Sequence, residues 1–377
     1  MKKYQFLGMG TLVLVIVLVG FSVAAQDYSR SLCDYDQPMT LYQDLGLELQ
    51  YHYYDDPAIG TQGDINRSSA FGNYQYIFST PNYSLNLNSN SFFSLTMDDV
   101  IYEASGVGRY NVYMPDSDLF AFGGVSLDLS SSFSEQAGVR VSTGTGYGRF
   151  KNVAPLVKAT LISELLREQG ALSAELSDST VDQIAQEIGK LGPGKGIDEV
   201  VTDVVSIIEG SPALQGDKLG AVEVLRIRET IQEVSDQRLC GWEIRGGLGY
   251  EVLDPQGGKR DFLVNTAARY ARPFTPYSQL SIGVDFSSPF EFGERYNLSG
   301  AATYSYRFLE NLDARLRYYF FFHQGEILTT YHQSVSATAE VQLQRDLSTA
   351  ITFSLTDGEN YAELEKEITL GLTYNVL

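Results

Sequence analysis

Three histidines are the side chains in this sequence best suited to metal binding or acid–base chemistry. His52, His323 and His332 each fall near the end of a segment that alternates apolar and polar residues, on its polar side. Imidazole is a common metal ligand, so a site formed by all three is conceivable. A lipid hydrolase would instead need His323 or His332, together with an acid or amide, beside a serine such as Ser334. No nucleophile motif surrounds Ser334, and we expect polar lining residues with no metal, cofactor or catalytic site.

A glycine-rich segment, 189–196, matches the first part of a phosphate-binding loop. The match fails at Gly196, which stands where a serine or threonine must bind magnesium. The segment also follows a predicted helix and not a strand, so we interpret it as a flexible linker. Gly144, Gly146 and Gly148 form no dinucleotide motif either. They share one face of a predicted strand, where they relieve crowding beside tyrosines.

Cys33 and Cys240 are the only two cysteines of the chain. An even number in an exported protein indicates a disulfide, because the periplasm is oxidising. Each cysteine directly precedes one of the membrane-crossing strands predicted below, and both of these strands begin on the same side of the membrane, which favours pairing. Closing so long a loop would stabilise the fold by up to about 5 kcal/mol on the chain-entropy model.

The elements that must position these residues are strands. From residue 41 to 149 the sequence has a period of two, and the period returns after residue 240. It is clearest in 331–343 and in the last segment, 364–376. Alternating segments of about ten residues are typical of strands that cross a membrane at a tilt. A β-sandwich also alternates, but its strands are usually shorter.

We therefore predict an all-β fold, a transmembrane antiparallel up-and-down β-barrel of about 14 strands (12–16) with an α-helical insertion. Residues 26–152 supply about six strands and residues 239–377 about eight. An even number of strands puts both termini in the periplasm. Long connections such as 55–68 then fall outside the cell, and short turns such as Pro81-Asn82 fall in the periplasm.

Residues 153–238 interrupt the alternation with helical spacing. Pro155 fits the start of the first of four helices, which ends at Gly170. Apolar stripes, such as Val200, Val204 and Ile208, indicate that the helices pack on another surface. By strand parity this insertion lies on the periplasmic side, either hanging there as a bundle or tucked into the barrel as a plug. The sequence leaves both arrangements open.

Residues 1–25 have the three parts of a signal peptide. Lys2 and Lys3 precede the apolar run Thr11–Phe21, and small residues lead to Gln26, the predicted mature start. A retained anchor helix is the alternative, although the run is short for a membrane span. Cleavage would change the formal net charge from −20 to −22, which argues against a nucleic-acid partner.

Strand parity also predicts which side chains face the lumen. Acids outnumber arginines among them, so an open pore would favour cations. The predicted lumen-facing residues are Glu48, His52, Asp128, Arg140, Arg245, Arg269, Asp285, Arg315, Arg317, His323, His332 and Glu340, with further acids at Glu243, Glu251, Asp313, Glu365 and Glu367.

The alternation, the signal peptide and the terminal strand ITLGLTYNVL (368–377) together resemble the bacterial outer-membrane β-barrel superfamily across essentially the whole mature chain. Such proteins usually end on a phenylalanine or tyrosine in the alternating apolar register. Here Tyr374 and Val376 occupy that register, and one further residue, Leu377, follows them. Segment 146–159, a strand running into a helix, is similar to the insert of uncharacterised outer-membrane barrels. The resemblance implies residence in the outer membrane of a Gram-negative-type bacterium, with membrane lipid, barrel-assembly machinery and periplasmic chaperones as partners.

Three functions are consistent with these features. The leading hypothesis is a porin-like or substrate-specific passive channel with a mixed-charge, acid-rich lumen. The second is a structural or docking protein whose insertion, residues 153–238, binds a periplasmic protein. The third is a surface lipid-modifying enzyme.

Overall fold

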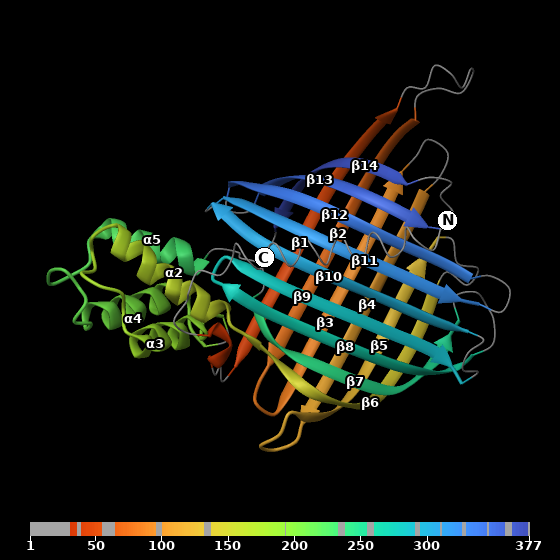
Figure 1. Cartoon of the computed structure of the whole chain (residues 1–377), viewed down its shortest axis with the longest axis horizontal. Coiled ribbons are helices and arrows are strands. Elements are labelled where there is room, and N and C mark those ends of the chain that lie inside the picture. The colour runs from red at the N-terminus through yellow and green to blue at the C-terminus, as the bar shows by residue number, and fades with distance from the viewer. Residues whose placement is uncertain are drawn as a thin grey trace.

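The computed structural model describes thirteen ranges of the chain: residues 31–35, 39–54, 65–95, 100–131, 137–192, 194–232, 238–254, 260–290, 295–309, 311–325, 329–344, 347–358 and 364–375. They form a closed antiparallel barrel with a bundle of helices beyond one end (Figure 1). The predicted signal peptide, residues 1–25, lies outside the described ranges.

Six strands precede the helices and eight follow them. The first group is β1 (Thr40–Tyr54), β2 (Ile65–Ser79), β3 (Tyr83–Leu95), β4 (Val100–Tyr113), β5 (Leu119–Ser130) and β6 (Ala137–Asn152). The second group is β7 (Leu239–Leu253), β8 (Phe262–Thr275), β9 (Ser278–Pro289), β10 (Tyr296–Leu309), β11 (Leu312–Gln324), β12 (Thr329–Gln344), β13 (Leu347–Gly358) and β14 (Glu365–Asn375).

Each strand pairs with its neighbours in the sequence, and β1 pairs with β14 to close the barrel. This confirms the predicted up-and-down barrel of about fourteen strands. Closure leaves no strand edge with unpaired backbone groups. A sheet that spans a membrane must be closed in this way, because lipid cannot hydrogen-bond to an open edge. With an even number of antiparallel strands, β1 starts and β14 ends on the side from which the helices leave. We call this side the helical end.

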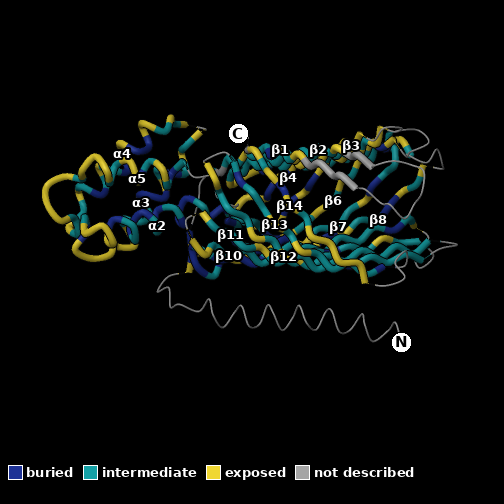
Figure 2. The backbone as a smooth tube through the Cα atoms, turned by 90° about the horizontal axis from the view of Figure 1, so that it is seen from above, coloured by how far each residue is buried: buried dark blue, intermediate teal, exposed yellow. Residues whose placement is uncertain are grey.

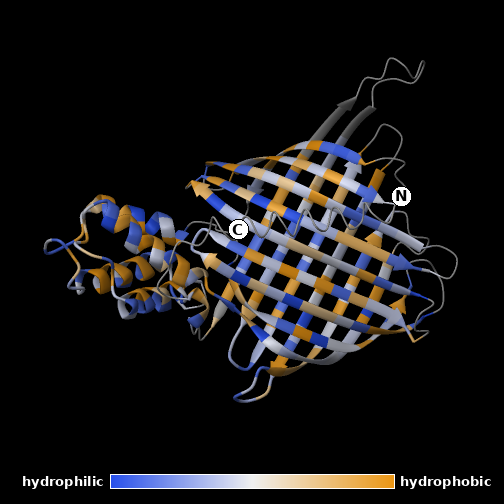
Figure 3. Ribbon diagram, in the orientation of Figure 1, coloured by the Kyte–Doolittle hydropathy of each residue, from blue (hydrophilic) through white to orange (hydrophobic). Residues whose placement is uncertain are grey.

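The two faces of the barrel wall differ because successive side chains of a strand point to opposite faces. Along β1 and β14, Leu47, Leu49, Ile368 and Leu370 are 46–74% exposed on the outer face. Polar residues occupy the alternate positions, and Figure 3 shows this alternation along the strands. An exposed apolar band of this kind is stable against lipid and unfavourable in water.

The helical insertion has a core of its own. It comprises α2 (Ala154–Glu168), α3 (Asp178–Ile188), α4 (Ile197–Glu209) and α5 (Ala221–Gln232). Ile162, Ile184, Val204 and Ile227 are fully buried between these helices (Figure 2). The described helices lie beyond the end of the barrel and do not plug its lumen (Figures 1 and 2). No helix in the described ranges is long and apolar enough to span a membrane.

The segment between α3 and α4 differs from the predicted flexible linker. Lys190 and Lys195 both bind the carboxylate of Glu187, and Nζ of Lys195 lies 2.7 Å from Oε2 of Glu187. Lys195 also donates to Asp203 on α4, at 2.5 Å. The sequence motif gave no sign of these ion pairs, which close the glycine-rich segment into a compact turn.

The predicted disulfide forms between Cys33 and Cys240, whose Cα atoms are 5.5 Å apart. Cys33 lies in η1 (Leu32–Asp34), and Cys240 lies at the start of β7. The flanking Leu32 and Tyr35 are buried in the core of the helical bundle. Burial, followed by the charge of Asp182, raises the pKa of Tyr35 and keeps its hydroxyl neutral. The disulfide therefore fixes the N-terminal segment to the bundle and the barrel at once.

Candidate functional site: the barrel lumen

The register of the strands and one ion pair define the inner face of the barrel. Arg109 on β4 binds Glu243 on β7 at 3.3 Å, although β5 and β6 separate these strands in the wall. Two side chains can meet over this distance only by crossing the interior. Residues that share their parity through the pairing register therefore also face the lumen.

A network of charges lines the wall formed by β4 and β7 to β9. Glu243 also binds Arg245 at 2.8 Å, and its side chain is only 3% exposed. Arg269 donates two hydrogen bonds to Asp285, at 2.6 and 2.8 Å, and Arg245 lies 3.7 Å from the same carboxylate. Three arginines thus share two acids, and we call these five residues the arginine network. Charge-assisted bonds of this kind hold long side chains against the wall.

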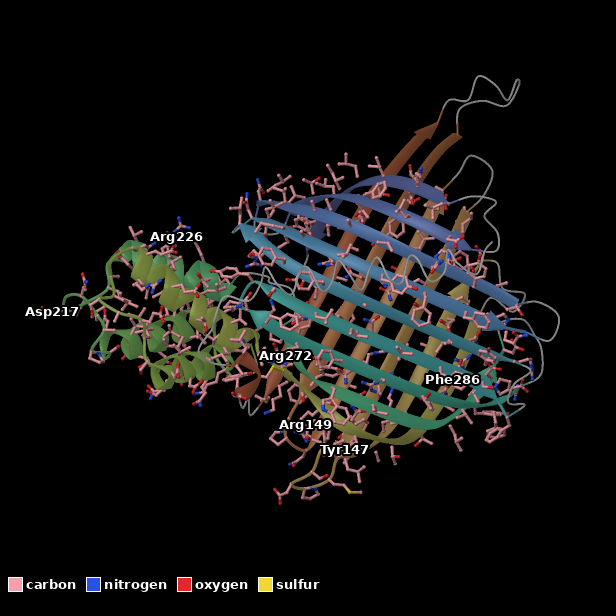
Figure 4. The ribbon with its side chains drawn as sticks, in the orientation of Figure 1. Tyr147, Arg149, Asp217, Arg226, Arg272 and Phe286 are labelled. Atoms are coloured by element: carbon pink, nitrogen blue, oxygen red, sulfur yellow. A yellow bond between two sulfur atoms is a disulfide. The ribbon has the colours of Figure 1, made fainter. Side chains whose placement is uncertain are left out.

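Aromatic rings fill the lumen next to the arginine network. Phe120 and Phe122 on β5 have inward parity and are buried. A Cβ atom at Gly144 would lie 2.8 Å from the ring of Phe122, and one at Gly146 would lie 2.3 Å from the ring of Phe120. These glycines therefore make room for phenylalanines, and the prediction that they sit beside tyrosines was wrong. The adjacent tyrosine, Tyr147, is exposed on the barrel (Figure 4), and its ring centre lies 5.6 Å from that of Trp242.

The opposite part of the lumen is acidic and less filled. A cavity of about 390 Å³ is lined by strands β1 to β3 and β11 to β14, and its charged residues are Asp44, Glu48, Asp313, Arg315 and Glu340. Four of these five are acids. A second cavity, of about 400 Å³, is lined by Glu103 and Asp128 together with serines and phenylalanines. We call the charged residues of the first cavity the acidic wall.

Of the remaining predicted lumen residues, several have defined partners. Arg140 binds Glu251 at 2.9 Å, and Ser348 donates to Glu340 at 2.6 Å. The guanidinium of Arg317 lies 5.9 Å from the ring centre of Tyr319. Glu365 and Glu367 share the parity of Thr373 on β14, which lies opposite Glu48.

The histidines form no metal site among the described residues. His323 is hydrogen-bonded through Nδ1 to Asn297 at 2.6 Å, and the ring of His332 lies 6.0 Å from that of Tyr319. No cluster of three histidine, cysteine or acidic side chains suited to a metal occurs in the described part of the chain. His52 belongs to β1, but its side chain lies outside the described residues.

Sequence reasoning missed Arg109, Asp44 and Glu103 as lumen residues. Strand parity could have found Arg109, because Tyr110 and Val112 mark the outward face of the same predicted strand. Its partner on β7 carries no signal in the sequence, since the pairing crosses the closed barrel.

A closed antiparallel barrel with an apolar outer band and a charged lumen defines the class of protein. The described residues form a closed, fourteen-stranded, up-and-down antiparallel β-barrel, which is the architecture of barrels that cross a membrane. No family model and no curated protein matches its sequence.

The solved structures to which the chain is similar include the following three bacterial outer-membrane channels. An outer membrane channel from Pseudomonas putida F1 is 7% identical, with 90% of this chain and 96% of that one covered and a TM-score of 0.36. A BenF-like porin from Pseudomonas fluorescens Pf-5 is 8% identical, with 91% and 99% covered and a TM-score of 0.34. OccK2 (OpdF) from Pseudomonas aeruginosa, in complex with glucuronate, is 10% identical, with 90% and 98% covered and a TM-score of 0.34. At these scores the likeness supports no further argument, and the description of the fold rests on the closed sheet itself.

Proposed function

We propose that this protein is a passive outer-membrane channel for small polar solutes, with a preference for cations. The observation that carries the proposal is that the described helices pack beyond the barrel and do not enter its lumen, so they do not cover the cavity beside the acidic wall. A lumen lined by charged and hydroxyl side chains is costly to maintain unless water enters it.

The preference for cations follows from how the charges are distributed. The arginines of the arginine network are bonded to acids in the wall, which reduces their effect on a passing ion. The acidic wall holds four acids and one arginine around a cavity, and a further arginine, Arg307, binds one of these acids, Asp313, at 3.1 Å, so acids remain in excess. A lumen with an acid excess lowers the energy of cations more than that of anions.

The helical end faces the periplasm in this proposal. Its strand connections are short, as at 276–277, 310–311 and 345–346, whereas the opposite end has longer ones such as 55–64 and 254–261. Outer-membrane barrels have short periplasmic turns and long external loops. Chaperones and the barrel-assembly machinery would then act on the chain after export and removal of residues 1–25.

The test is conductance of the purified full-length protein in planar bilayers, with the reversal potential measured in a salt gradient. We expect stepwise currents and a cation preference. The double variant Asp313→Asn, Glu340→Gln should lower the cation-to-anion permeability ratio by at least about fivefold, since one charge a few Å from an ion in water contributes roughly 1 kcal/mol, a factor of about five.

The matched control removes two exposed acids from the helical bundle, Glu175→Gln and Asp217→Asn. Asp217 lies at the far tip of the bundle (Figure 4), so this variant should conduct as the unchanged protein does. Absence of current from correctly folded protein would refute the channel, and an unchanged permeability ratio in the lumen variant would refute the cation preference.

One observation supports a second candidate, a docking function for the helical bundle. Val222 and Leu225 on α5 are 64% and 54% exposed, beside the buried Ile227. Exposed apolar residues on one helix can bind a partner protein. Co-purification of a periplasmic protein that is lost in Val222→Asp, Leu225→Asp would favour this candidate.

A further inference from the structure

A groove of about 750 Å³ lies where the helical bundle meets the rim of the barrel. Its helical side includes Leu161 and Leu165 of α2 and Arg226 of α5, and its barrel side includes Phe308 and Leu343. The volume is within the range of about 300–1,000 Å³ that is usual for small-ligand sites. We call it the rim groove.

The barrel side of the rim groove is apolar and exposed. Phe308, Leu309 and Leu343 are 61%, 61% and 55% exposed, and Phe308 packs on Tyr306 with ring centres 4.7 Å apart. Phe308 and Leu343 both fall where the pairing register of their strand shifts. Such irregularities change the direction of a side chain at the end of a strand. These residues therefore continue the apolar outer band of the barrel into the groove.

The helical side of the rim groove carries charges of both signs. Arg226 binds Glu229 one turn further along α5 at 3.1 Å, and both side chains are about half exposed. Figure 4 shows Arg226 on the bundle. Glu164 and Glu168 of α2 lie in the same lining, and Glu164 accepts a hydrogen bond of 2.8 Å from Tyr277 in the turn between β8 and β9. This bond fixes α2 against the rim and holds the groove open between them.

From an apolar rim facing a mixed-charge helical surface, we infer that the rim groove binds one zwitterionic phospholipid. Its acyl chains lie on Phe308, Leu309 and Leu343, in continuity with the lipid around the barrel. Arg226 binds the phosphate, for which a guanidinium is well suited. Glu168 binds the ammonium group.

The charge balance favours a zwitterionic headgroup over an anionic one. The lining holds three acids, Glu164, Glu168 and Glu229, against two arginines. One of these arginines, Arg307, is bound to Asp313 at 3.1 Å with a side chain only 9% exposed. The inference depends on the barrel lying in a bilayer and not on its conducting ions, so the two proposals can fail separately.

The test is native mass spectrometry of the full-length protein in detergent with added phosphatidylethanolamine. We expect one lipid to remain bound, with about tenfold weaker apparent affinity in Arg226→Glu and in Leu343→Asp. The matched control is Arg228→Glu, because Arg228 is an exposed arginine of the same helix that binds Asp198 at 2.8 Å and does not line the groove. The control should bind lipid as the unchanged protein does.

Two further ligands test the details of the site. Phosphatidylglycerol should bind more weakly than phosphatidylethanolamine, and glycerophosphoethanolamine, which lacks acyl chains, should not displace the lipid. Equal lipid binding by Arg226→Glu and Arg228→Glu would overturn the inference, as would a preference for phosphatidylglycerol. Because Leu343→Asp alters the barrel rim, its folding is checked by heat-modifiable migration on gels, while Arg226→Glu leaves the barrel sequence intact.

Discussion

Glu243 is the only buried carboxylate among the described residues, and two arginines bind it from different strands. Removing one partner of a buried ion pair destabilises a protein far more than removing one partner of an exposed pair, because no solvent can take the place of the lost partner. At this position the lumen is therefore a structural core as well as a polar surface.

Glu243→Gln should lower the free energy of unfolding by about 3 kcal/mol, because it leaves Arg109 and Arg245 without this carboxylate. The measurement is a urea titration of the folded barrel in detergent micelles. The control is Glu251→Gln, whose partner Arg140 is 39% exposed, with an expected loss of about 1 kcal/mol or less. Equal losses in the two variants would contradict the structural role of the arginine network.

The glycines of β6 allow a second residue-scale prediction. A Cβ at Gly144 would lie 2.3 Å from the backbone oxygen of Gly246, so Gly144→Ala should destabilise the barrel by about 1–3 kcal/mol. Gly123 on β5 is a matched control, because its Cβ would meet nothing within 4 Å. The same urea titration should show little change for Gly123→Ala, and a similar loss in both variants would argue against the tight packing of β6 on β7.

The turn between α3 and α4 is an element whose stability should depend on pH. Hydrogen bonds from Lys190 and then Lys195 lower the pKa of Glu187. The stabilisation from a lowered carboxylate pKa is present above the unfolded value of about 4.3 and is lost as the pH falls through the folded value. We therefore expect the helices to become less stable as the pH is lowered from about 5 to about 3. The measurement is the urea concentration at the midpoint of helix unfolding, followed by circular dichroism at 222 nm, which should decrease over this range.

Glu187→Gln should show a smaller decrease over this range, because it has no charge to lose. The control is Glu175→Gln, since Glu175 is 68% exposed and pairs only at the surface with Arg167. That control should keep most of the acid dependence. An identical pH response in all three proteins would exclude the Glu187 turn as its source.

The whole molecule has two separate cores, one in the helical bundle and one in the barrel wall and lumen. The bundle core also includes Leu32, Tyr35 and Cys240, so we expect the segment around Leu32 to unfold with the helices. Since the two parts share few buried apolar contacts, each should lose its structure at its own denaturant concentration.

Two transitions should therefore appear in urea, with the helices unfolding first. The chain has a single tryptophan, Trp242, which projects from the outer face of β7 and reports on the barrel. Its fluorescence should change at a higher urea concentration than the ellipticity at 222 nm, which reports mainly on the helices. Coincident transitions would show that bundle and barrel unfold as one unit.

The sequence by itself determined the strands, their inward and outward faces and the existence of a helical insertion, because the periods of two and of about 3.6 are local properties of the chain. It also placed Cys33 and Cys240 on one side of the barrel. Only the tertiary structure decided that the helices pack on one another and on Leu32, since an apolar stripe requires a partner without specifying which one. Likewise, Arg109 meets Glu243 only because the sheet closes into a barrel, which brings together strands that are neighbours neither in sequence nor in the wall.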